Sequence, residues 1–105
     1  MAQFDVFENR DTASRKGAPY LLDVQSELLA DLATRVVIPL ARQSRDGLAE
    51  IERLMPAFEI EGVALTLVTP QLAGVPRAIL GARVASLADR RHDIIAALDV
   101  LISGV

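Results

Sequence analysis

Residues 86–105 read Ser86-Leu-Ala-Asp-Arg-Arg-His-Asp-Ile-Ile-Ala-Ala-Leu-Asp-Val-Leu-Ile-Ser-Gly-Val105. Their apolar side chains recur at spacings of three and four, the pattern of a helix with one buried face, at Leu87, Ile94, Ile95, Leu98, Leu101 and Ile102. Ser86 and Asp89 have capping-box spacing, and Gly104 can adopt the left-handed conformation that ends a helix. The stretch therefore predicts a C-terminal helix whose last turn projects from the fold.

Upstream of this helix, short apolar runs separated by turn residues predict β-strands. The strongest signal is Val36–Ala41, which is continuously apolar and rich in β-branched residues. Because Pro39 cannot donate a ladder hydrogen bond, we expect this strand to lie at an edge or to carry a bulge. Residues 57–60 and 63–69 flank Glu61-Gly62 and predict a hairpin. Further strands are expected over residues 3–8, 20–24 and 75–80.

The segments between the strands are rich in turn residues or lack clear periodicity. We expect a loop over 9–19, a short helix or irregular excursion over 42–55, a turn over 70–74 and a connection over 81–85. The adjacent Leu28 and Leu29 either fill the core or lie on a surface that meets a partner. Strands that end in one helix predict a mainly β fold with α, in a single domain over 1–105. Its architecture is a small antiparallel β-barrel or sheet with the C-terminal helix packed on it.

Composition narrows the class of protein. The chain has 105 residues, enough for one core, and no cysteine, which excludes disulfides and thiolate metal sites. A net charge of −3 disfavours direct binding to nucleic acid, and no apolar run is long enough to span a membrane. The N-terminus lacks the pattern of a signal peptide, so we expect a cytoplasmic protein. A hydrophobic share of 51% indicates apolar surface buried between subunits, as in a homodimer.

Residues able to carry catalysis are few. His92 is the only histidine, and without cysteine a metal site would have to be built from carboxylates. Asp89 and Asp93 are four residues apart, but Arg90 and Arg91 beside them indicate a solvated, charged helix face. The glycines match neither common phosphate-binding pattern, and no serine stands in a nucleophile elbow. The sequence thus predicts a protein that is not an enzyme and needs neither cofactor nor metal.

Six short segments follow one another in a characteristic order: Met1-Ala-Gln-Phe-Asp-Val6, Leu22-Asp-Val-Gln-Ser26, Val37-Ile-Pro-Leu-Ala41, Leu72-Ala73 with Val75-Pro76, Asp93-Ile94 and Gly104-Val105. In this order they resemble the CcdB family, the toxins of plasmid and chromosomal toxin–antitoxin modules. The resemblance extends over the whole chain. Its most specific part is Asp-Val-Gln-Ser followed by Val-Ile-Pro-Leu-Ala.

The resemblance implies a fold, an activity and partners. The fold would be a small β-barrel related to SH3-like barrels, with a C-terminal helix and a two-fold homodimer. Such toxins poison DNA gyrase: the paired C-terminal helices bind the gyrase A subunit and hold its cleaved-DNA state. A cognate antitoxin would cover the toxin with a disordered segment that folds on binding, and would strip it from gyrase.

Carried over by position, the resemblance assigns gyrase contacts to Leu28, Leu29, Asp99, Ile102, Ser103, Gly104 and Val105. The aliphatic members match isoleucines or a phenylalanine of the family, and Asp99 matches an asparagine. The main departure is Ser103, where the family has a tryptophan that stacks on an arginine of gyrase. Loss of the ring removes a cation–π contact and much buried area, about 1–2 kcal/mol at each of two sites. Leu98 and Leu101 are expected to serve core or dimer packing instead.

Two alternatives to gyrase poisoning stay open at this point. The first is a homologue that still binds an antitoxin but no longer poisons gyrase, for which Ser103 and Asp99 are the reason. The second is an endoribonuclease, since ribonuclease toxins share this barrel fold. Its base, acid and phosphate-binding cations would have to be drawn from Asp23, Arg35, Arg77 and His92.

Overall fold

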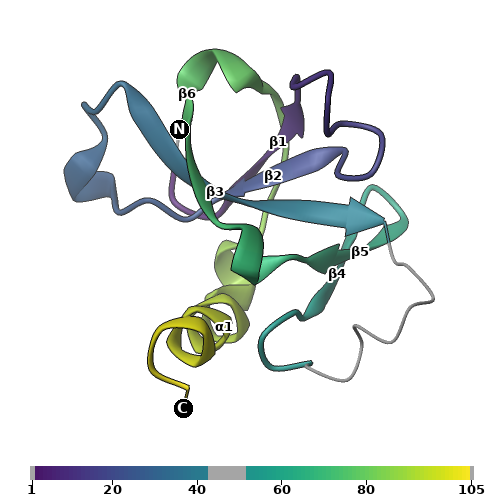
Figure 1. Ribbon diagram of the computed structural model, residues 1–105, viewed down its shortest axis with the longest axis vertical. Helices are drawn as coiled ribbons and strands as arrows, with labels where there is room; N and C mark the ends of the chain where they lie inside the picture. The colour runs from purple at the N-terminus through teal and green to yellow at the C-terminus, as the bar shows by residue number, and fades with distance from the viewer. Residues whose placement is uncertain (1, 43–51, 105) are drawn as a thin grey trace.

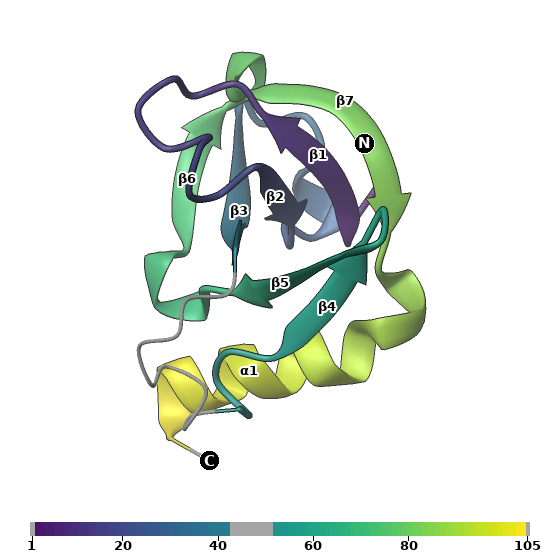
Figure 2. The same cartoon turned by 90° about the vertical axis from the view of Figure 1, so that its right-hand side faces the viewer.

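A curled antiparallel sheet, with one helix packed against it, makes up the fold (Figure 1). The computed structural model describes residues 2–42 and 52–104. The strands are β1 (Asp5–Asn9), β2 (Tyr20–Asp23), β3 (Thr34–Arg42), β4 (Ala57–Ile60), β5 (Val63–Leu67), β6 (Ala73–Pro76) and β7 (Leu80–Ser86), and the helix is α1 (Arg91–Ser103). The sheet curls into a half-barrel (Figure 2). The predicted class, mainly β with a C-terminal helix, is confirmed.

The long strand β3 is the centre of the sheet. The strand order is β4-β5-β3-β2-β1-β7, and β6 pairs with β3 beside β5. On one side β3 pairs with β2, and on the other it pairs first with β6 and then with β5. The strongest strand signal in the sequence therefore belongs to the strand with the most partners.

Pro39 lies inside this central strand, so the expectation of an edge or a bulge was wrong. Pairing with β2 runs through Pro39 without a shift in register. On the opposite side, Pro39 falls between the residues that pair with β6 and those that pair with β5. Its carbonyl there accepts a hydrogen bond from the Val68 N–H at 2.9 Å. Because the N and C=O of one strand residue point to the same side, the missing donor faces the gap where β3 changes partner.

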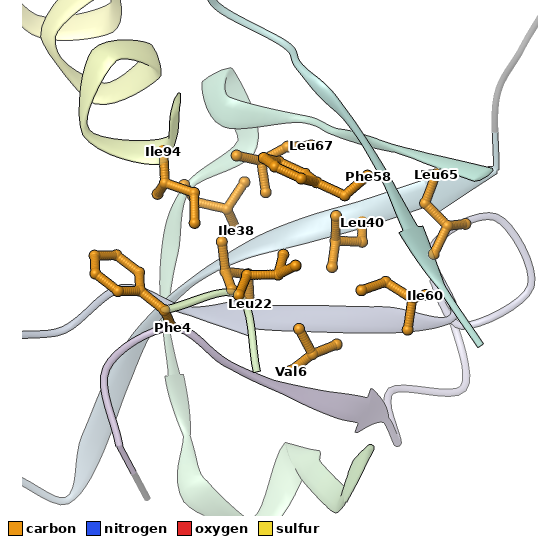
Figure 3. Close-up of a cluster of buried hydrophobic side chains, with 11 residues drawn as sticks. Phe4, Val6, Leu22, Ile38, Leu40, Phe58, Ile60, Leu65, Leu67 and Ile94 are labelled. Carbon is orange, nitrogen blue, oxygen red and sulfur yellow. The ribbon is translucent and has the colours of Figure 1, made fainter. Parts of the chain in front are cut away.

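The core occupies both faces of the sheet. The main cluster, drawn in Figure 3, contains Phe4, Val6, Leu22, Ile38, Leu40, Phe58, Ile60, Leu65, Leu67, Leu87 and Ile94. A second cluster on the other face contains Phe7, Leu21, Val37 and Leu80. Neighbouring residues of one strand thus enter different clusters, which explains why the central strands read as apolar runs.

The first strand begins at Asp5 and not at Gln3. Phe4 has a φ of 71°, in the left-handed region that bulky side chains rarely adopt. Its N–H donates to the Asp23 carbonyl at 2.6 Å, and its own carbonyl accepts from the Leu87 N–H at 2.8 Å. The ring is 3% exposed within the main cluster. Burial and these two hydrogen bonds offset the backbone strain.

The predicted hairpin of β4 and β5 is confirmed. Glu61 and Gly62 connect the strands with φ values of 51° and 80°. Positive φ at both central residues is the mark of a type I′ turn, whose twist matches that of the flanking strands. The second strand is shorter than expected, because Thr69 already lies in the 3-10 turn η3 (Thr69–Gln71).

The strand expected over 75–80 and the connection expected over 81–85 were both wrong. β6 ends at Pro76, the turn η4 (Arg77–Ile79) follows, and β7 occupies the supposed connection and pairs with β1. Gly81 gives the physical reason. A Cβ at this position would lie 2.9 Å from the Cβ of Glu8, so glycine is what allows β7 to approach β1.

The C-terminal helix begins at Arg91, later than predicted. The Ser86 Oγ accepts from the Ala88 N–H at 3.2 Å, but the N-cap of the 3-10 turn η5 (Ala88–Arg90) is Leu87 and that of α1 is Arg90, so the capping box of Ser86 with Asp89 was wrong. The predicted end of the helix at Gly104 is confirmed: Gly104 has a φ of 74°, and its N–H donates to the Val100 carbonyl.

Only a narrow face of α1 is covered. Ile94 and Ala97 are fully buried, and Leu98 packs partly against the main cluster. Ile95, Leu101 and Ile102 remain 40%, 38% and 82% exposed. The predicted apolar stripe thus divides into a part that holds the helix to the sheet and a part that is left free. No helix among the described residues is long and apolar enough to cross a membrane.

The segment expected to form a short helix or irregular excursion, 42–55, lies mostly outside the described residues. Arg42 is the last residue of β3, and residues 52–54 form a turn before β4.

Tyr20 gives a prediction that tests the packing of the hairpin turn. Burial and the nearby Glu61 carboxylate raise the pKa of Tyr20 above 10.0. Folded-state stability should therefore fall as pH rises from 10 through this raised pKa, because only the unfolded chain ionises freely. The chain has one tyrosine and no tryptophan, so tyrosinate absorbance follows this group alone. We expect a midpoint above 10.0, a lower one in Glu61→Gln, and no change in Glu59→Gln. A wild-type midpoint at 10.0 or below would contradict this account.

Candidate partner-binding surfaces

The first candidate surface is a short turn with three exposed leucines. The 3-10 turn η1 (Glu27–Leu29) and the residues after it place Leu28, Leu29 and Leu32 at the surface, 94%, 50% and 49% exposed. We call residues 26–32 the leucine turn. The alternative that Leu28 and Leu29 fill the core is thereby excluded. Covering such side chains is favourable by about 25 cal/mol per Å² of apolar surface, so this turn gains from contact with a partner.

Two polar residues hold the leucine turn from its N-terminal side. The Ser26 Oγ accepts from the Leu28 N–H at 3.2 Å and caps the turn. Gln25, which is buried, donates from Nε2 to the Leu29 carbonyl at 2.7 Å. Its Oε1 accepts from the Val36 N–H of β3 at 3.0 Å. One amide side chain therefore ties the turn to the central strand.

A buried ion pair lies next to Gln25. Asp23 and Arg35 have no exposed side-chain surface, and Arg35 Nε and Nη2 donate to Asp23 Oδ2 at 2.9 and 2.6 Å. The other carboxylate oxygen, Oδ1, accepts from the Gln25 N–H at 3.0 Å. Among the described residues, Arg35 Nη1 finds no hydrogen-bond partner. The pair thus depends on a single carboxylate to balance a buried guanidinium.

Arg77 holds the leucine turn from its C-terminal side. Its Nε donates to the Leu32 carbonyl at 3.1 Å, and its Nη2 donates to the Ala30 carbonyl. Because Arg77 belongs to η4, this contact joins the turn to the connection between β6 and β7. The three leucines are therefore presented on a turn that is fixed at both ends, which lowers the entropy lost when a partner binds.

The second candidate surface is the exposed face at the end of α1. We call Ile95, Asp99, Ile102 and Ser103 the helix tip. Their spacing of three and four places them on one side of the helix, and all four are exposed. Gly104 follows as the helix terminator, and Val105 lies outside the described residues.

Ser103 has no side-chain group that projects from the helix tip. Its Oγ donates to the Asp99 carbonyl at 2.7 Å, one turn back along the helix. The hydroxyl is thus satisfied within α1. At the position where the resemblance places a tryptophan, the last turn offers only the small side chain of serine.

The leucine turn and the helix tip do not lie together on one chain. The leucine turn follows β2 on one side of the sheet, while the end of α1 lies well away from it in both views (Figures 1 and 2). A partner that contacts both surfaces at once must reach around the molecule or bind two copies of the chain.

The residues considered for an endoribonuclease form no open site. Asp23 and Arg35 are fully buried and bonded to each other, so neither can reach an RNA strand. Arg77 uses its guanidinium to hold the leucine turn, and His92 lies exposed on α1. General acid–base catalysis needs both groups within reach of one substrate. Nothing in this arrangement supports that alternative.

A hollow of about 750 Å³ opens between the loop after β1, the end of β3 and the start of α1. Arg90, on its wall, donates to Asp93 at 2.9 Å and stacks 4.8 Å from the centre of the Phe58 ring. These charges are therefore already paired. Across residues 2–42 and 52–104, no group of three or more His, Cys, Asp or Glu side chains is placed to hold a metal ion.

The sequence analysis did not identify Leu32 of the leucine turn, nor Gln25 and Arg77, the two residues that hold the turn from outside it. Leu32 lies four positions after Leu28, and this spacing could have indicated that both share one surface. The roles of Gln25 and Arg77 had no such signal, because their partners are carbonyl and amide groups contributed by other segments.

A comparison with protein families matches the family described as CcdB protein to residues 3–104, nearly the whole chain.

Proposed function

The chain belongs to the CcdB family, the toxins of toxin–antitoxin modules, and on this basis we propose that it poisons DNA gyrase by binding the A subunit and trapping cleaved DNA. The family consists of protein toxins and not of classical enzymes, and its members act against gyrase and are countered by antitoxins. The toxin would act in the cytoplasm, where gyrase and DNA are found.

One observation supports this proposal beyond family membership. Leu28 and Ile102 were assigned to gyrase by resemblance, and they are the two most exposed large apolar side chains of the described residues, at 94% and 82%. Neither contributes to the core. Such side chains do not stabilise the monomer, whereas covering them in a complex contributes to the free energy of binding. Leu29, Asp99, Ser103, Gly104 and Val105 would complete the contact.

A homodimer is part of the proposal. The two candidate surfaces lie apart on one chain, so a partner could contact both surfaces by binding two copies of the chain. A two-fold pair of chains would also present two helix tips, one for each half of a gyrase A dimer. The same exposed leucines and isoleucines would be covered by the antitoxin, through a disordered segment that orders on binding. No nucleic-acid contact by the toxin itself is required, which agrees with its net charge of −3.

A gyrase cleavage assay tests the proposal. Purified protein is incubated with supercoiled plasmid, ATP and gyrase from the native host, and the enzyme is then denatured. We expect linear DNA to accumulate. Leu28→Glu should reduce it by about ten- to a hundredfold in apparent potency, because burying one leucine contributes about 1.5–3 kcal/mol.

Val63→Glu is the matched control, since Val63 is an exposed aliphatic residue of the hairpin, 39% exposed and outside both candidate surfaces. Circular dichroism establishes that both variants fold. If the wild-type chain produces no linear DNA at any concentration, the proposed function is wrong.

The alternative of a homologue that binds an antitoxin without poisoning gyrase retains one supporting observation. Ser103 has no ring where the resemblance places a tryptophan, and its hydroxyl bonds back to the Asp99 carbonyl of α1. The cleavage assay and a measurement of antitoxin binding together distinguish gyrase poisoning from this alternative. Antitoxin binding without any cleavage product would favour the alternative.

A further inference from the structure

The leucine turn is not held in place by the hydrophobic core. None of the residues of η1 is buried, and every residue from 26 to 34 is exposed or half-buried. Inside this stretch, the N–H groups of Leu29, Ala30 and Leu32 donate to carbonyls three residues earlier. Such short turns are marginal in water without tertiary contacts. The shape of the leucine turn therefore depends on the bonds that tie it to the rest of the fold.

Arg77 provides this tie on the C-terminal side of the turn. Within residues 2–42 and 52–104, the hydrogen bonds that join residues 30–33 to other segments are the two from Arg77, to the Ala30 and Leu32 carbonyls. The two donors, Nε and Nη2, lie in one rigid plane, so together they fix the orientation of both peptide groups. Loss of Arg77 would leave the turn held at its N-terminal side alone.

The position of Arg77 is itself fixed by the core. Pro76, just before it, pairs with Thr34 of β3, and Val75 and Ile79 on either side pack against the second core cluster. The Arg77 side chain is exposed. Hydrogen bonds between exposed groups add little to global stability, because water can replace them. Removing this side chain should therefore loosen the leucine turn and leave the fold intact.

We propose that Arg77 is a positioning residue for binding to the gyrase A subunit: it does not touch the subunit, but keeps the leucine turn in the conformation that binds. The inference rests on the proposed function, because it takes this subunit as the partner that covers Leu28 and Leu29. A surface that is ordered for only part of the time binds more weakly, in proportion to the fraction of chains in the competent conformation. Affinity at the leucine turn is thus controlled from η4.

Binding kinetics of full-length variants with the intact gyrase A subunit test this role. Arg77→Met keeps a side chain of moderate length and removes both donors. We expect about tenfold weaker binding, seen as slower association with unchanged dissociation, because the complex is the same once the turn has ordered. Leu28→Ala trims a side chain proposed to contact the subunit, so it should instead speed dissociation.

Two further variants separate positioning from charge. Arg77→Lys keeps the positive charge but cannot place two donors in one plane, so it should bind nearly as weakly as Arg77→Met. Arg91→Met is the matched control. It removes an exposed arginine from the first position of α1, changes the net charge equally, and should bind as the wild type does.

Backbone relaxation of the free protein, measured by NMR, gives a readout that does not involve the partner. In the wild type, the amides of residues 28–32 should have order parameters typical of rigid backbone, about 0.85, and in Arg77→Met these should fall toward about 0.6. The melting temperature should change little, since the lost hydrogen bonds are exposed. Unchanged order parameters in Arg77→Met would overturn the inference.

The kinetic outcomes are distinct. If Arg77→Lys binds as tightly as the wild type, or if Arg77→Met mainly speeds dissociation, Arg77 contacts the subunit directly, and the inference is overturned while the proposed function stands. If Leu28→Ala leaves dissociation unchanged, the leucine turn is not the contact and the inference is likewise overturned. If the wild-type chain forms no complex with the subunit, the proposed function fails and the inference fails with it.

Discussion

Replacing Asp23 by alanine is expected to lower the free energy of unfolding by about 3–5 kcal/mol, the usual cost of leaving one partner of a buried ion pair uncompensated. Arg35 would keep its guanidinium at 0% exposure, with Nη1 already lacking a partner among the described residues. The Gln25 N–H would lose its acceptor as well. Because domains of this size are stable by about 5–15 kcal/mol, much of that stability would be lost. Urea unfolding at a fixed protein concentration measures the change.

The double variant Asp23→Leu with Arg35→Met is the control for this result. Replacing a buried ion pair by apolar side chains of similar volume is often neutral or stabilising, so this variant should recover most of the loss. A single Asp23→Ala variant that loses less than about 1 kcal/mol would contradict the account, because it would mean that Arg35 finds another partner or reaches water.

Introducing tryptophan in Ser103→Trp is expected to raise affinity for the gyrase A subunit by about ten- to a thousandfold. Each ring contributes about 1–2 kcal/mol through stacking on a cation and through buried area, and a two-fold complex gains the contact twice. Ser103 is exposed at the last position of α1, so the larger side chain meets no packed neighbour.

Ser103→Ala is the control, since it also removes the hydrogen bond to the Asp99 carbonyl but adds no ring. This variant should bind gyrase as the wild type does and melt at a similar temperature. Growth arrest on expression in a gyrase-sensitive host gives an independent measure. If Ser103→Trp neither binds more tightly nor arrests growth more strongly, the missing ring is not what limits this toxin.

The parts of the fold that could be predicted from sequence depend on neighbouring residues. The Glu61-Gly62 turn and the Gly104 terminator each require a positive φ that their sequence allows, and both were identified correctly. The apolar run in β3 likewise marked a buried strand. In each case the residues that determine the conformation lie within a few positions of one another.

The errors arose where distant segments determine the conformation. Gly81 was expected to begin a connection, but it permits contact with Glu8 on a strand at the other end of the chain. Pro39 looked like an edge residue, but the change of partner from β6 to β5 leaves room for its missing donor. Phe4 interrupts its strand because the core receives its ring. The hydrophobic pattern within one segment cannot predict contacts with distant segments.

For the candidate surfaces too, local features could be predicted from the sequence, while contacts with distant segments could not. Leu28 and Leu29 could be singled out as an adjacent apolar pair, but only their exposure shows that they are free for a partner. The contacts that fix them come from Gln25 and Arg77, whose hydrogen bonds reach the leucine turn from outside it. For Ser103, the resemblance to the family indicated the missing ring, and the structure adds that the serine hydroxyl already bonds to the Asp99 carbonyl.

The pairing of β1 with β7 has a consequence for how the toxin is made. One edge of β1 pairs with β2, but on the other edge Asp5 pairs with Ser86, so that edge has no partner until a segment about eighty residues later is synthesised. Closing so long a loop before the contact is formed is unfavourable, and sheets built from such distant pairs fold in about milliseconds to seconds. At about 5–20 residues per second of synthesis, the nascent chain spends several seconds without its completed sheet. A ribosome translating this message therefore carries, for those seconds, a chain whose sheet still has an open edge at β1.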